Sequence, residues 1–164
     1  MKKIVVFVVL AAILATGTVF ADHPEGWGVG VVGGGGWDGV GGGGNAALSL
    51  KVPGIPVFWS IELGFPADGI NLGVAGDFYL IDDNLIDSLL GWYFGIGAFV
   101  GFGLYEGGYF NVGARLPVGL SLQFPVSSLT LEFFLSFVPR LGFESDDSPL
   151  YFRIGGEAGL RVWF

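Results

Sequence analysis

Apolar and polar side chains alternate with a period of two along most of this chain, the pattern of β-strands with one apolar and one polar face. The C-terminal segment, residues 151–164, shows it most clearly. One parity carries Phe152, Ile154, Gly156, Ala158, Leu160, Val162 and Phe164, and the other carries Tyr151, Arg153, Gly155, Glu157, Gly159, Arg161 and Trp163. This segment is therefore predicted to form a strand.

The same alternation predicts eight strands in all, at residues 27–32, 45–51, 57–64, 70–80, 92–103, 109–123, 129–138 and 151–164. Gly, Pro, Asp and Ser are frequent between these segments, and each of them favours turns. For residues 82–90 a short helical turn is the alternative to a plain loop. The glycine runs at 33–36 and 41–44 are expected to form a mobile surface loop, since neither a lysine nor a helix follows them as in a phosphate-binding loop.

The distribution of charge predicts that the strands cross a membrane. No charged residue lies on the apolar parity of a predicted strand, and such a charge would cost ~2–4 kcal/mol near the bilayer midplane. Backbone groups in lipid must all be paired, so β-strands there must close into a barrel. A soluble lipocalin-like barrel is the alternative, but the polar parity here is rich in glycine while the apolar parity carries the bulky side chains. The expected fold is all-β: an eight-stranded antiparallel up-and-down transmembrane β-barrel.

The start of the chain is expected to lie outside this barrel. Lys2 and Lys3 precede an apolar run, and the sequence Val19-Phe20-Ala21 then offers a cleavage site. This is the layout of a secretory signal peptide, and the run is too short for a spanning helix. Residues 1–21 are therefore predicted to be a cleaved signal peptide and residues 22–164 the barrel domain; an uncleaved membrane anchor is the alternative.

Eight charged residues on the polar parity are expected to meet inside the barrel, because the interior of an eight-stranded barrel has room for side chains only. An unpaired buried charge is costly, so acids and bases should pair there. The expected lumen charge network consists of Lys51, Glu62, Asp77, Arg115, Glu132, Arg153, Glu157 and Arg161. The predicted lumen is therefore filled and not an open pore.

Several classes of chemistry are disfavoured. The chain has no cysteine and one histidine, His23, which is expected to lie in a frayed N-terminal tail. We therefore expect no enzyme, no cofactor and no metal site. A cation bound by the acidic segment Glu144, Asp146 and Asp147 is a weaker alternative to a solvated loop. The net charge of −8 disfavours nucleic acid as a partner.

The C-terminal strand resembles the terminal signal that the outer-membrane barrel assembly machinery recognises, with Leu160, Val162 and the final Phe164 as the assembly signal. Segments beginning at Gly91, Gly113 and Leu131 resemble a family of small, mostly uncharacterised bacterial outer-membrane barrels of the spirochaete type, and the architecture is similar to that of OmpX and OmpW. The resemblance implies location in the outer membrane, with the lipid bilayer and the assembly machinery as partners. It implies no settled activity.

The function expected from these features is that of a structural or surface-interaction component of the bacterial envelope, with an extracellular ligand of unidentified kind. The alternative is a small porin-like or OmpW-like channel for ions or apolar small molecules.

Overall fold

The computed structural model describes residues 23–37, 42–66, 69–104, 108–145 and 150–164; the predicted signal peptide at 1–21 lies outside them. The described residues form β-structure, and no helix among them is long and apolar enough to cross a membrane. The nine strands are β1 (Gly28–Trp37), β2 (Gly42–Lys51), β3 (Phe58–Phe65), β4 (Asn71–Ile86), β5 (Leu90–Gly103), β6 (Tyr109–Arg115), β7 (Val118–Val126), β8 (Leu129–Glu144) and β9 (Leu150–Trp163).

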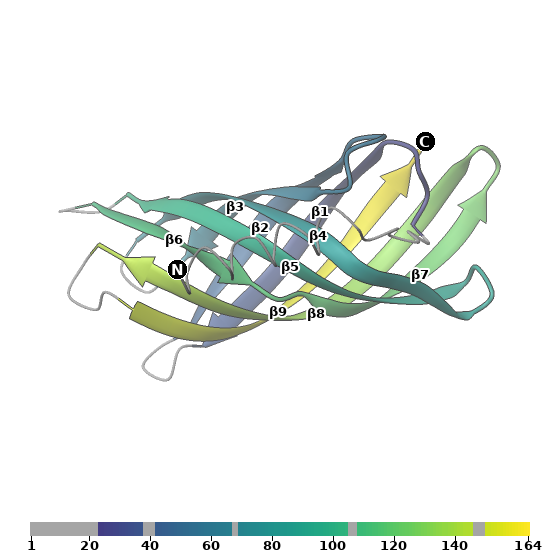
Figure 1. Cartoon of the computed structure of the whole chain (residues 1–164). Coiled ribbons are helices and arrows are strands. Elements are labelled where there is room, and N and C mark those ends of the chain that lie inside the picture. The colour runs from purple at the N-terminus through teal and green to yellow at the C-terminus, as the bar shows by residue number, and fades with distance from the viewer. Residues whose placement is uncertain (1–22, 38–41, 67–68, 105–107, 146–149) are drawn as a thin grey trace.

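The strands form one antiparallel sheet that closes on itself (Figure 1). Strands that follow one another in the chain are paired, except β6 and β7, each of which pairs with β5 on one side and β8 on the other. The last strand, β9, pairs with β1 over the whole length of β1, from Gly28 opposite Trp163 to Trp37 opposite Ile154. Closure gives each strand a neighbour on both sides over at least part of its length. On the β3 side of β4 the pairing ends at Asp77, while β4 itself continues to Ile86. The predicted all-β, up-and-down barrel is confirmed.

Strands β6 and β7 together occupy one of the eight places in the ring. Both lie between β5 and β8. Strand β6 pairs with the C-terminal half of β5, which ends at Gly103, and with the C-terminal part of β8, which ends at Glu144; β7 pairs with the N-terminal parts of the same two strands. The break falls at Leu116 and Pro117, because proline has no N–H to donate to a ladder. The gap is bridged by the Leu116 N–H, which donates to Pro139 (3.0 Å), and by the Gly95 N–H, which donates to Pro117 (2.8 Å).

Two sequence predictions about loops are wrong. The glycine run at 33–36 is part of β1 and pairs with β2 on one side and β9 on the other; of the second run, Gly42–Gly44 belong to β2, and Gly41 lies outside the described residues. Paired on both sides, a glycine strand keeps its backbone hydrogen bonds without side chains. The segment after residue 80 is also strand: β4 continues to Ile86, and a tight turn closes where the Leu89 N–H donates to Ile86 (3.0 Å).

The two faces of the barrel have the polarity that the alternation predicts. Large apolar side chains cover the outside; Leu135 and Ile61, near the middle of their strands, are 62% and 60% exposed. Inside, aromatic rings fill the space above glycines on the neighbouring strand. Tyr93 lies over Gly119 and Phe134 over Gly159, and a Cβ at either glycine would stand 2.4 Å from a ring atom.

The two ends of the barrel differ. At one, which we call the terminal end, Trp27 and Phe164 exchange backbone hydrogen bonds of 2.9 and 3.0 Å. The turns after β2, β4 and β7 lie at this end, as Figure 1 shows for the β7–β8 hairpin beside the C-terminus. The opposite end, where Trp37 and Glu144 end their strands, we call the loop end.

Candidate functional site

The lumen holds an ion-pair cluster, here called the central layer, made of Glu62, Asp77, Arg115, Arg140 and Glu157. Its members come from β3, β4, β6, β8 and β9 and meet because all of them point inward. Arg115 donates to Glu62 and to Glu157, each at 2.7 Å. Arg140 donates to the same two carboxylates, at 2.9 and 2.7 Å. Two guanidinium groups thus share two carboxylates across the barrel.

Asp77 completes the central layer from the side. Its Oδ1 lies 3.0 Å from Nε of Arg115, an ion-pair distance, although neither atom has hydrogen-bond geometry toward a partner. The charge of Arg115 therefore faces three carboxylates. Neighbouring glycine makes this approach feasible: a Cβ on Gly97 would overlap both Asp77 and Arg115.

A second cluster, the terminal layer, lies nearer the terminal end and consists of His23, Asp82, Glu132 and Arg161. Arg161 donates to Glu132 at 2.7 Å. The other oxygen of Glu132 lies 2.9 Å from Nε2 of His23, while Nδ1 of His23 lies 2.6 Å from Asp82. With His23 protonated, the layer has two positive and two negative charges and is neutral.

Aromatic rings enclose the terminal layer. The imidazole of His23 has ring neighbours at centroid distances of 5.2–5.8 Å: Phe58, Tyr79, Tyr93 and Trp163. Trp163 also donates its indole N–H to Glu132 at 2.7 Å. The prediction that His23 lies in a frayed tail is wrong, because its side chain is buried inside the barrel.

The electrostatics favour the charged form of His23. Burial alone lowers the pKa of His23, but the negative charge of Glu132 and the hydrogen bonds to Asp82 and Glu132 outweigh burial and raise the pKa from 6.5 to about 9. The imidazolium can donate from both ring nitrogens, which matches a carboxylate on each side. At neutral pH His23 is therefore a positively charged bridge between β4 and β8.

The two remaining predicted network residues, Lys51 and Arg153, make contacts of other kinds. Lys51, at the end of β2, donates to the backbone of Val52 at 3.2 Å, and its amine lies 5.6 Å from the ring centre of Phe58. Arg153 lies over the ring of Tyr151, 5.1 Å from its centre. The structure thus brings six of the eight predicted residues into the two layers: Glu62, Asp77, Arg115, Glu132, Glu157 and Arg161.

Three charged residues of the layers are absent from the predicted network. Arg140 shares the inward parity of β8, but it lies two residues beyond residue 138, where the predicted strand ended, whereas β8 continues to Glu144. Asp82 faces inward because the β4–β5 register shifts between Tyr79 and Ile81, which reverses the side-chain parity beyond it. His23 precedes the first strand, so no alternation pattern includes it.

Residues of the predicted assembly signal lie on the outer face of β9. Leu160 pairs with Val31 and Phe133, and Val162 pairs with Val29 and Leu131. The Phe164 side chain is 61% exposed beside the terminal end. These residues therefore lie at the seam where the last strand meets the first.

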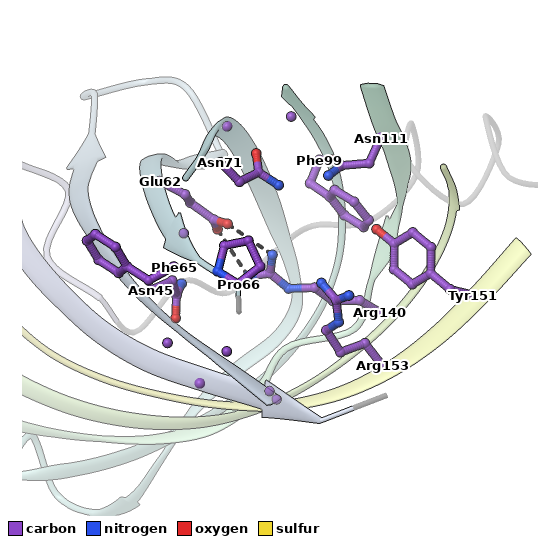
Figure 2. A pocket seen from close by; sticks show the side chains of 18 of the residues that line it. Asn45, Glu62, Phe65, Pro66, Asn71, Phe99, Asn111, Arg140, Tyr151 and Arg153 are labelled. Atoms are coloured by element: carbon purple, nitrogen blue, oxygen red, sulfur yellow. Dashed lines mark hydrogen bonds and ion pairs between the residues drawn. The ribbon is translucent and has the colours of Figure 1, made fainter. Parts of the chain in front are cut away.

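At the loop end the lumen widens into a cavity of about 370 Å³, here called the cup (Figure 2). The Arg140–Glu62 pair forms its floor. Side chains around it include Asn45, Asn71, Asn111, Phe99, Tyr109, Tyr151 and Arg153. A much smaller space of about 30 Å³ borders both Arg115 of the central layer and Arg161 of the terminal layer.

Within the described residues, no group of three or more acids or histidines is arranged to hold a metal ion. Asp146 and Asp147 of the weaker cation-site alternative lie outside the described residues, while Glu144 lines the cup.

The structure is thus that of a small closed β-barrel with an apolar outer face and two layers of ion pairs across its lumen. No protein-family model matches the sequence, and no curated protein matches it. Among solved structures, the chain is similar to the crystal structure of Neisserial surface protein A (NspA). The two are 11% identical with a TM-score of 0.47, and the match covers 86% of this chain and 98% of that one.

Proposed function

We propose that this protein is an outer-membrane β-barrel that is closed to solutes and serves the envelope as a structural or surface-interaction component. The observation that carries the proposal is the pair of charged layers. Each layer joins strands on different sides of the lumen by ion pairs of 2.6–3.0 Å. A solute crossing the barrel would have to break both.

The outer face supports the membrane part of the proposal. Exposed Val, Leu, Ile or Phe side chains occur on every strand from β1 to β9, and apolar residues all around the outside of a barrel are typical of a surface that lipid covers. A closed ring is also the one β-architecture that satisfies all backbone groups in a bilayer. Insertion by the barrel assembly machinery, through the C-terminal strand, is part of this proposal.

The alternative, a porin-like or OmpW-like channel for ions or apolar molecules, makes the opposite prediction in one experiment. The protein, refolded into planar bilayers, should give no reproducible single-channel steps. Steps of constant size that recur between preparations would refute the closed lumen and favour the channel. Folding of the same sample is checked by its faster migration on gels when it is not boiled.

No enzymatic activity is part of the proposal. His23 is the one histidine in the sequence, and both of its ring nitrogens lie within 2.9 Å of carboxylates. It therefore has no nitrogen left to activate a serine or a water molecule, as a general base must.

A further inference from the structure

The cup at the loop end is a cavity made by glycine. Inward-facing positions that would otherwise fill it are glycines on several strands: Gly36, Gly64, Gly73, Gly101 and Gly155. The resulting space of about 370 Å³ lies within the range of ~300–1,000 Å³ that small-molecule sites occupy. The terminal half of the same lumen is filled by aromatic rings instead, so the space is confined to one end.

Three amide side chains border the cup from different strands. Asn71 and Asn111 lie on neighbouring walls with Gly101 between them, where a Cβ would stand 2.8 and 2.5 Å from their oxygens. Asn71 donates to the Tyr109 hydroxyl at 2.9 Å. Asn45 borders the cup from β2. Each amide has two N–H donors and a carbonyl acceptor, so the walls offer donors and acceptors together.

The charge of the lining argues against an anionic ligand. Two arginines and three glutamates line the cup: Arg140, Arg153, Glu62, Glu144 and Glu157. Arg140 already donates to both Glu62 and Glu157, so its charge is neutralised within the floor. Aromatic rings complete the lining, with Phe99 and Tyr151 directed into the same space as Asn111 and Arg153 (Figure 2).

We infer that the cup binds a neutral, hydroxyl-rich ligand of the size of one or two sugar rings. Hydroxyl groups both donate and accept hydrogen bonds, as the amides of the walls do. A ligand can enter the cup without crossing either ion-pair layer. The inference therefore rests on the proposed function only for the side of the membrane that the cup faces.

The test is calorimetric titration of the folded barrel in micelles of an amine-oxide detergent, since detergents with sugar headgroups would compete. The probes are glucose, galactose, N-acetylglucosamine, maltose and lactose, with gluconate as the anionic comparison. We expect saturable binding of at least one neutral sugar and weaker binding of gluconate. Because the titration needs no membrane, its outcome is independent of any conductance measurement.

Two glycine variants provide a matched pair. Gly64→Leu places a side chain in the cup, where the first contact of its Cβ is Asn71 at 3.4 Å, whereas Gly33→Leu places the same side chain on the outer face, where a Cβ meets nothing within 4 Å. We expect the first to weaken sugar binding about tenfold, which corresponds to ~1.4 kcal/mol, and the second to leave it unchanged. Asn71→Ala should also weaken it. Absence of binding by all five sugars, equal effects of the two leucines, or tighter binding of gluconate would overturn the inference.

Discussion

Nε2 of His23 lies 2.9 Å from Oε1 of Glu132, a residue 109 positions later in the chain. This contact connects the segment before β1 to β8, on another part of the ring. The other ring nitrogen, Nδ1, contacts Asp82, so the imidazolium anchors the N-terminal segment inside the lumen at the terminal end. The consequences of this contact and of the central layer can be tested separately.

Stability should fall as the pH rises through the pKa of His23. Glu132 and Asp82 together outweigh the effect of burial and raise that pKa from 6.5 to about 9, which corresponds to about 3 kcal/mol. Because the folded-state pKa is the higher one, the contribution is fully present below pH 6.5 and is lost as the pH rises through about 9. The temperature at which the fast-migrating folded band converts to the unfolded band on gels, measured at pH 6, 8 and 10, should show this decline. In His23→Gln the decline should be absent; an unchanged decline would assign it to other groups.

Removing Arg115 should be the most damaging charge change in the central layer. Arg115→Met leaves Asp77 without its ion-pair partner and removes one partner from Glu62 and Glu157, and breaking a buried pair costs ~3–5 kcal/mol. The free energy of unfolding in urea, followed by tryptophan fluorescence, measures this. Lys51→Met is the matched control: its amine makes a backbone hydrogen bond at the strand end, so we expect a loss below about 1 kcal/mol. Equal losses would contradict the ion-pair account.

A charged substitution on the outer face should lower the free energy of unfolding more, the nearer it lies to the middle of the bilayer. Leu135, near the middle of β8, and Leu150, at the start of β9, are both outward and highly exposed, at 62% and 71%. In lipid, Leu135→Arg should cost ~2–4 kcal/mol and Leu150→Arg ~0–1 kcal/mol. Unfolding titrations in lipid vesicles measure both. If the two arginines had the same small effect, the outer face would not be in contact with lipid.

Single cysteines should report which end of the barrel faces outward. The native chain has no cysteine, and serines are available at both ends: Ser145 at the loop end, and Ser88 and Ser128 at the terminal end. In intact cells a membrane-impermeant maleimide should label Ser145→Cys and leave Ser88→Cys and Ser128→Cys unlabelled until the cells are opened. The reverse pattern would invert the proposed orientation and place the cup on the inner side.

The strands and their faces could be predicted because side-chain alternation is a local property. In β9, the predicted inward residues Arg153, Glu157 and Arg161 do point inward, and Leu160 and Val162 lie on the outer face. Glycine-rich β1 could not be predicted to its full length, since Gly33 and its neighbours carry no alternation. What makes them a strand is pairing on both sides: Gly33 lies opposite Ala46 of the neighbouring β2 and opposite Ala158 of β9, at the far end of the chain.

The period-two pattern is read from the sequence alone, and with it an all-β chain that has one apolar and one polar face. Closure of the ring then decided which charges meet. Asp82 lies on the apolar parity of β4, and only the register shift between Tyr79 and Ile81 turns it inward toward His23. Parity is fixed by neighbouring residues, whereas a bulge and a contact between His23 and Glu132 are fixed by the partner strand and by the curvature of the closed sheet.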